Sequence, residues 1–190
     1  MRDYVREHPL FSLCGLNCGL CPRFHTAGNS RCPGCGGADF SAKHPTCPII
    51  TCSRRHGEVE FCFECASYPC NRYRAPPETD SFITYRNVIA NCEKARTKGP
   101  AAYLADLGEK VGMLRTFLAL YDDGRKKSFY CLAVNLLSTR DVREISEEMA
   151  RATRGRDMTK KDAASRLESL LKERATQKGI PLVLRKGEGT

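Results

Sequence analysis

The spacing of the cysteines constrains this 190-residue chain more than any other feature. Ten of its 12 cysteines lie between Cys14 and Cys70. Disulfide-rich scaffolds are typical of small exported chains, whereas the N-terminus here is charged and is followed only by the short apolar run 10–13. That run is too short for the apolar core of a signal peptide. We therefore expect a cytoplasmic protein whose thiols are reduced and bind metal.

The ten cysteines fall into two successive sets of five. The positions are Cys14, Cys18, Cys21, Cys32 and Cys35, then Cys47, Cys52, Cys62, Cys65 and Cys70. Two cysteines separated by two residues bind one ion readily, because the tight loop directs both sulfurs at one point. Two such loops supply the four sulfur ligands, about 2.3 Å from the metal, that structural Zn²⁺ sites use. All ten cysteines are candidate ligands, and we predict two zinc sites.

Spacing alone leaves the assignment of ligands to each site open. One economical arrangement joins Cys18 and Cys21 to Cys32 and Cys35, and Cys47 and Cys52 to Cys62 and Cys65. Cys14 and Cys70 are then free to substitute for a ligand or to ligate across the two sites. Three histidines lie between the cysteines and can replace a thiolate: His25, His44 and His56.

An iron–sulfur cluster is the alternative to zinc. Cys14, Cys18 and Cys21 supply three closely spaced thiolates, as [4Fe–4S] sites do, with the fourth ligand coming from elsewhere. The same spacing occurs in the cluster loop of radical S-adenosylmethionine enzymes. Here, however, Leu20 occupies the position of an aromatic residue, and no alternating series of strands and helices follows. If the cysteines hold an iron–sulfur cluster instead of zinc, we expect a redox or electron-transfer protein.

The distribution of glycine and proline predicts two parts. Both residues recur through 14–75 and leave no room for a long helix or strand, whereas apolar residues after position 80 recur at spacings of three and four. Pro76 and Pro77 are expected to interrupt regular structure at the boundary between these two parts. We predict an α class fold with a small irregular metal-bound module. Residues 1–75 form the cysteine-rich metal-binding module, and residues 76–190 form a mainly helical domain packed on it.

Local signals place the boundaries of the helices. Asp80 or Ser81 is expected to begin a helix that Gly99 ends, and Pro100 opens the next, whose apolar stripe runs to Tyr121. Further caps and terminators are expected at Ser138 or Thr139, at Thr159 with Asp162, and at Gly179. The apolar segment 180–184 suits an edge strand. The two remaining cysteines, Cys92 and Cys131, lie on apolar helix faces and are expected to be buried.

The cysteine motifs resemble those of an uncharacterised cysteine-rich family of bacteria and archaea, a domain of unknown function. The matching pieces are Cys14-Gly-Leu-Asn-Cys-Gly-Leu-Cys-Pro22, Cys32-Pro-Gly-Cys35, Cys47-Pro-Ile-Ile-Thr-Cys52 and Cys62-Phe-Glu-Cys-Ala-Ser-Tyr-Pro-Cys70. The similarity extends to residues 123–133 and 179–186. A short spacer, residues 24–31, is the main departure from the pattern. The resemblance supports metal binding and supplies no reaction.

Charge and motifs narrow the function further. The formal net charge is +9, but four thiolates around Zn²⁺ leave about −2, so two sites lower it to about +5. Positive and negative residues interleave, which gives little support to a nucleic-acid partner, and no apolar run approaches the roughly 20 residues of a membrane span. The chain contains no P-loop, dinucleotide fingerprint or metalloprotease helix, and Asp122 with Asp123 suits a solvated turn. We expect a structural or interaction role, with an unknown protein as partner. A catalyst with an open metal position, or with a reactive thiolate such as Cys14 or Cys70, is a third hypothesis with little support from the motifs, and no catalytic residues are identified.

Overall fold

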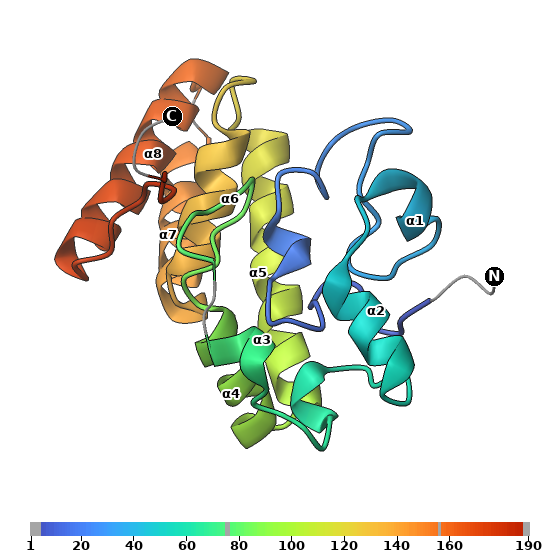
Figure 1. Ribbon diagram of the computed structural model, residues 1–190. Helices are drawn as coiled ribbons and strands as arrows, with labels where there is room; N and C mark the ends of the chain where they lie inside the picture. The colour runs from blue at the N-terminus through green and yellow to red at the C-terminus, as the bar shows by residue number, and fades with distance from the viewer. Residues whose placement is uncertain (1–4, 75–76, 156, 188–190) are drawn as a thin grey trace. The chain divides into compact units, whose positions relative to one another are not determined.

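The computed structural model describes residues 5–74, 77–155 and 157–187, and every regular element within them is a helix (Figure 1). The cysteine-rich part holds two 3₁₀ turns, η1 (Cys18–Leu20) and η2 (Cys62–Glu64), and three short α-helices. These are α1 (Phe40–Lys43), α2 (Pro48–Arg55) and α3 (Asn71–Arg74). The longer helices are α4 (Val88–Lys98), α5 (Pro100–Leu120), α6 (Lys127–Leu136), α7 (Thr139–Thr153) and α8 (Lys160–Gln177). The predicted helical second half is confirmed.

The chain divides into two compact units. The first comprises Met1–Leu107 with Leu184–Thr190, and the second comprises Gly108–Val183, so the division falls within α5. The first unit, which contains the ten cysteines from Cys14 to Cys70, therefore extends well beyond residue 75. Because residues 75 and 76 lie outside the described residues, the predicted boundary between a module 1–75 and a domain 76–190 stays a prediction.

In the first unit, α4 and the start of α5 supply an apolar surface on which the cysteine-rich segment packs. The ring of Phe11 lies 4.6 Å from that of Tyr103 and 5.5 Å from that of Phe61, measured between centroids. Gly15 contacts α4 so closely that a Cβ there would lie 2.1 Å from the carbonyl oxygen of Val88. With φ at +91°, this position favours glycine on both steric and conformational grounds.

Arg6 ties the N-terminal lead-in to two separate parts of the cysteine-rich segment. Its guanidinium is almost fully buried and donates to the carbonyl oxygens of Phe11 (2.9 Å) and Cys35 (3.2 Å). It also pairs with the carboxylate of Glu60 at 3.1 Å and stacks over the ring of Phe61. Since loss of one partner would leave a buried charge unpaired, Arg6 fixes the positions of these loops relative to one another.

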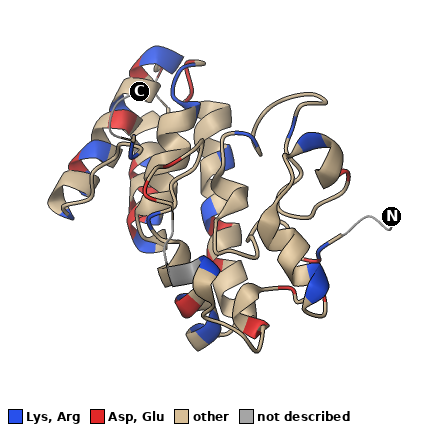
Figure 2. Cartoon of the chain, in the orientation of Figure 1, with Lys and Arg blue, Asp and Glu red and all other residues tan. Residues whose placement is uncertain are grey.

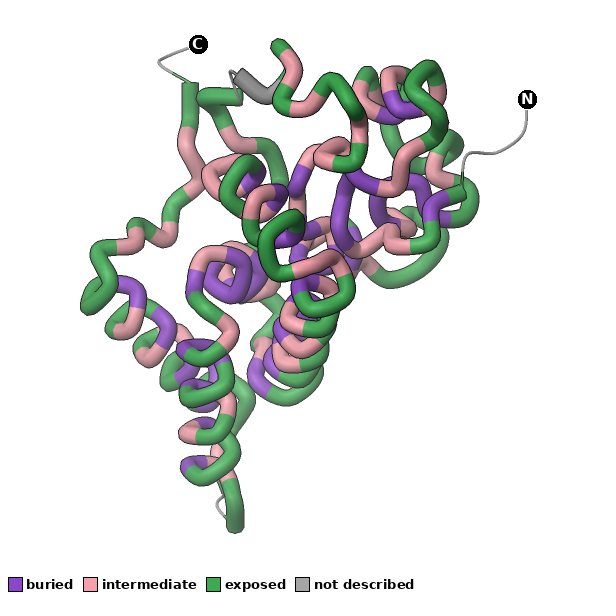
Figure 3. The backbone as a smooth tube through the Cα atoms, turned by 90° about the horizontal axis from the view of Figure 1, so that it is seen from below, coloured by how far each residue is buried: buried purple, intermediate pink, exposed green. Residues whose placement is uncertain are grey.

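In the second unit each helix buries one face, and the buried residues recur along one side of each helix (Figure 3). α7 buries Val142, Ile145 and Met149, and α8 buries Leu167 and Leu171, at the spacings of three and four expected after position 80. The cap predictions are confirmed as well: Ser138 accepts from the amide of Asp141, and Thr159 accepts from the amide of Asp162.

Lys110 satisfies the C-terminal end of α6. Its buried ammonium donates to the carbonyl oxygens of Leu137 (2.8 Å) and Asn135 (3.3 Å), at the end where an α-helix needs donors from outside its own ladder. Elsewhere along the helices positive and negative side chains interleave (Figure 2). None of the described helices combines the length and the apolar character that a bilayer crossing requires.

Two predictions made from the sequence are wrong, one for residues 80–98 and one for residues 180–184. The helix expected from Asp80 begins at Val88 instead, with Asn87 before it. Instead of starting a helix, Asp80 accepts hydrogen bonds on its carboxylate from the amide and the guanidinium of Arg185. Residues 180–184, where an edge strand was expected, form irregular chain with a bend at Val183. Just after this segment, the Asp80 amide donates to the Arg185 carbonyl at 2.9 Å. Arg185 also donates to the carbonyl oxygen of Pro77 at 2.9 Å, so this residue links the tail to the segment 77–80.

Candidate functional site

The structure brings six of the ten candidate cysteines into one group, which we call the first cysteine group. Its members are Cys14, Cys18, Cys21, Cys32, Cys35 and Cys47. The thiol of Cys18 lies close enough to interact electrostatically with Cys14, Cys21, Cys32 and Cys35. Cys47, at the start of α2, interacts with Cys14 and Cys35. The local spacing did not indicate this proximity of Cys47 to Cys14.

Hydrogen-bond donors lie close to the sulfurs of Cys14 and Cys21. The 3₁₀ turn η1 begins at Cys18, and its end is marked by a bond from the amide of Cys21 to the carbonyl of Cys18, at 3.1 Å. The amides of Arg23 and Phe24 approach the sulfur of Cys21. The sulfur of Cys14 lies 3.1 Å from the hydroxyl of Ser12. Donors directed at sulfur favour the thiolate form, which is the form that binds metal.

The Cys32–Cys35 turn depends on glycine. Gly34 has φ at +88°, and a Cβ there would lie 2.4 Å from the carbonyl oxygen of Pro9. The amide of Cys35 donates to that same carbonyl at 2.9 Å. The tight turn is thereby held against the N-terminal lead-in, with the buried thiol of Cys35 turned toward Leu13 and Ile50.

Burial dominates the electrostatics of the first cysteine group. Desolvation raises the pKa of Cys14, Cys18, Cys21 and Cys35, and neighbouring sulfurs raise the pKa of Cys18 further. The pKa of Cys35 reaches about 11, with Arg6 lowering it in part. Several thiolates at this site therefore need a cation among them, because they are withdrawn from water and repel one another.

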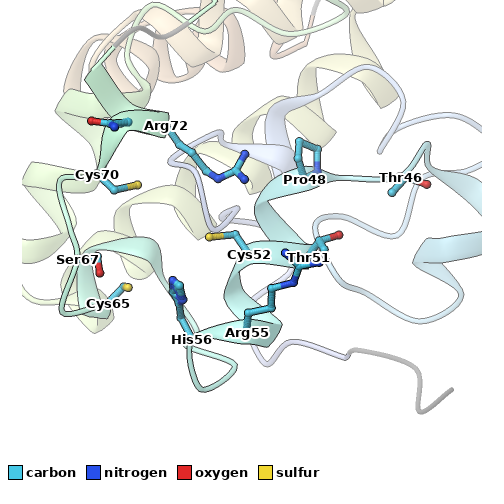
Figure 4. Close-up of a pocket in the computed structure, with 11 residues that line it drawn as sticks. Thr46, Pro48, Thr51, Cys52, Arg55, His56, Cys65, Ser67, Cys70 and Arg72 are labelled. Atoms are coloured by element: carbon cyan, nitrogen blue, oxygen red, sulfur yellow. The ribbon is translucent and has the colours of Figure 1, made fainter.

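The other four cysteines form the second cysteine group, Cys52, Cys62, Cys65 and Cys70. Cys52 belongs to α2, Cys65 follows η2 and Cys70 precedes α3. Figure 4 shows the side chains of Cys52, Cys65 and Cys70 around one cavity, with the ring of His56 between them. Cys62 lines a smaller adjoining cavity together with the other three.

The cavity at the second cysteine group is open to solvent, unlike the buried first cysteine group, and side chains with positive charge line it. Its volume is about 670 Å³. Arg55 and Arg72 contribute to its wall, along with Thr51, Ser67 and Asn71. The sequence patterns did not indicate this arrangement, since Arg55 and Arg72 are separated by 17 positions and by both Cys62 and Cys65.

Across the described residues, no set of three or more Cys, His, Asp or Glu side chains is arranged tightly enough to hold one metal ion. The donor types nevertheless suit Zn²⁺, because two groups of sulfurs are available with one histidine beside the second. His25 and His44 bond to the backbone, at 2.8 Å from the carbonyl oxygens of Gly19 and Pro45. Of the three loop histidines, His56 alone lines the cavity of the second group.

Several other sequence-based expectations are met. Cys92 and Cys131 are buried in the apolar interior of their units, as expected. Asp122 and Asp123 form a turn in which their carboxylates accept from the amides of Gly124 and Arg125. That arrangement leaves these two carboxylates in a structural turn.

Residues 10–75 match the model of a family described as "Protein of unknown function (DUF3795)". The matched segment contains all ten cysteines of the two groups, so the resemblance to an uncharacterised cysteine-rich family is confirmed for this segment. The match ends at residue 75, and the similarity of residues 123–133 and 179–186 stays a prediction. No curated protein and no solved structure matches the chain.

Proposed function

We propose that this protein binds two Zn²⁺ ions through its two cysteine groups, and that the ions hold the N-terminal segment in shape for a structural or interaction role. One observation carries the proposal. Between residues 25 and 60 the buried hydrophobic residues are only Cys35 and Ile50. Besides these two, only the partly buried Phe40, Cys47, Ile49 and Val59 pack on the same small cluster. This apolar packing is little to order 36 residues, whereas closed cysteine–zinc sites contribute folding free energy directly.

The proximities favour a division of ligands that differs from the one suggested by spacing. Cys14 and Cys35 each lie close to both Cys18 and Cys47, so we assign the first ion to these four. Cys21 and Cys32 adjoin Cys18 as reserve ligands. The second ion is assigned to Cys52, Cys62, Cys65 and Cys70, with His56 able to replace one sulfur.

An iron–sulfur cluster is the second candidate, and the size of the first group favours it. Six sulfurs gather where one zinc ion needs four, and three of them come from the closely spaced loop Cys14, Cys18 and Cys21. That loop supplies three cluster ligands, with Cys35 or Cys47 as the fourth. A redox or electron-transfer role in the cytoplasm would follow from this alternative.

Elemental analysis of anaerobically purified full-length protein tests both candidates. We expect a colourless protein with about two zinc equivalents, whereas a brown protein absorbing near 400 nm with iron and sulfide would establish the alternative. Cys35→Ser and Cys65→Ser should each remove about one equivalent. Cys131→Ser, in the second unit, is the matched control and should leave the metal content unchanged. A protein free of bound metal would refute both candidates.

A further inference from the structure

The cavity at the second cysteine group carries two arginines that metal binding by sulfur does not explain. Arg55 comes from α2 and Arg72 from α3, and both side chains line the same cavity (Figure 4). Neither guanidinium forms an ion pair with a carboxylate in the part of the chain that the structure describes. No Asp or Glu is among the described residues that line the cavity.

We propose that this cavity binds a small phosphate-bearing molecule, with Arg55 and Arg72 as the groups that hold its phosphate. A guanidinium presents planar pairs of N–H donors that match the oxygens of a phosphate, and two of them lining one cavity can neutralise a dianion. Ser67 and Asn71 add neutral donors on the same cavity.

The size and shape of the cavity favour a small molecule over a polymer. A volume of about 670 Å³ lies within the range of small-molecule sites, roughly 300–1,000 Å³. Nucleic-acid surfaces instead spread Lys and Arg along a face, and the charges on these helices interleave in sign (Figure 2). Of the cavity's residues, the two arginines supply the positive charge.

A competing role for the arginines is to offset the negative charge of four thiolates around a metal. The two roles make different predictions. If the arginines only offset thiolate charge, neutralising them weakens metal retention and has no effect on phosphate binding. If they hold a phosphate, neutralising them weakens phosphate binding whether or not the metal content changes.

The test is a titration of the isotopically labelled full-length protein, as purified, with inorganic phosphate at constant ionic strength maintained by sodium chloride. Saturable shifts are expected in the amide signals of residues 51–56 and 65–72. Arg55→Gln and Arg72→Gln should each weaken the affinity by about tenfold, since a hydrogen-bonded charge is lost. The double variant should abolish saturation, and Lys43→Gln, which removes an exposed cation of α1, should match the wild type.

Three results would overturn the proposal. The first is a shift that grows linearly with phosphate and does not saturate. The second is saturation that survives in the double variant. The third is saturation by a single-stranded DNA oligonucleotide but not by free phosphate, which would assign the arginines to a polymer. Zinc and iron are measured in each sample, so a failure of phosphate binding is distinguished from a failure of metal binding.

Discussion

The contact between Gly15 and α4 sets how the first cysteine loop is placed, and its strength can be measured. In Gly15→Ala the new Cβ would lie 2.1 Å from the carbonyl oxygen of Val88 and 2.8 Å from the sulfur of Cys92. Backbone atoms cannot yield as a flexible side chain does, so the loop or the helix must move. Such overpacking costs about 1–3 kcal/mol.

Gly28→Ala is the matched control. Gly28 also has a positive φ, +74°, but nothing lies within 4 Å of the position that a Cβ would take. Both substitutions incur about 1–2 kcal/mol for the left-handed conformation of an L-residue. Their effects on the unfolded chain cancel in the comparison. We therefore expect Gly15→Ala to lower the free energy of unfolding of the first unit by about 1–3 kcal/mol more than Gly28→Ala does.

The assay is urea unfolding followed through the amide signals of α4, which report on the first unit. Metal content is measured in parallel, because a displaced loop should also retain metal at Cys14 and Cys18 less tightly. Equal losses of stability in the two variants, within about 0.5 kcal/mol, would show that Gly15 does not pack on α4 and would refute the reasoning.

Two further predictions concern polar contacts. The pKa of Asp80 is about 2, because hydrogen bonds from Arg185 and from the amide of Tyr85 outweigh the burial that would raise it. A carboxyl whose pKa is lowered on folding stabilises the protein at pH values above its unfolded pKa. About 2 kcal/mol of the free energy of unfolding should therefore be lost as the pH falls from 4 to 2. In acid titrations, Asp80→Asn should flatten that part of the stability–pH profile. Lys110→Met should destabilise the second unit by about 1–3 kcal/mol in thermal unfolding, because the carbonyls at the end of α6 lose their donor, whereas the exposed Lys160→Met should have little effect.

The sequence predicts those parts of the fold that depend on neighbouring residues. Ser138 and Thr159 cap α7 and α8 as expected, because a cap requires only the hydroxyl and an amide three residues later. The start of α4 was misplaced because Asp80 bonds to Arg185, which is 105 positions away. A local pattern carries no information about such a partner.

The candidate site likewise combines features that the local sequence predicts with features that depend on distant partners. The cysteines were identified as ligands by their spacing, but the proximity of Cys47 to Cys14 and Cys35 comes from the folding of the lead-in and α2 around Leu13. That Arg55 and Arg72 line the same cavity likewise depends on how the chain folds between α2 and α3. Arg55 belongs to the short cluster Arg54-Arg55-His56, a pattern that can bind phosphate but is more often simply solvated, and Arg72 belongs to no such cluster.

Amide hydrogen exchange with and without a chelator tests most directly whether metal–sulfur bonds order the N-terminal segment. After metal removal under reducing conditions, we expect residues 14–70 to lose protection and α6, α7 and α8 to retain it. The helices of the second unit contain neither cysteine group and keep their own apolar core. Equal protection of residues 14–70 in the treated and untreated protein would contradict the account.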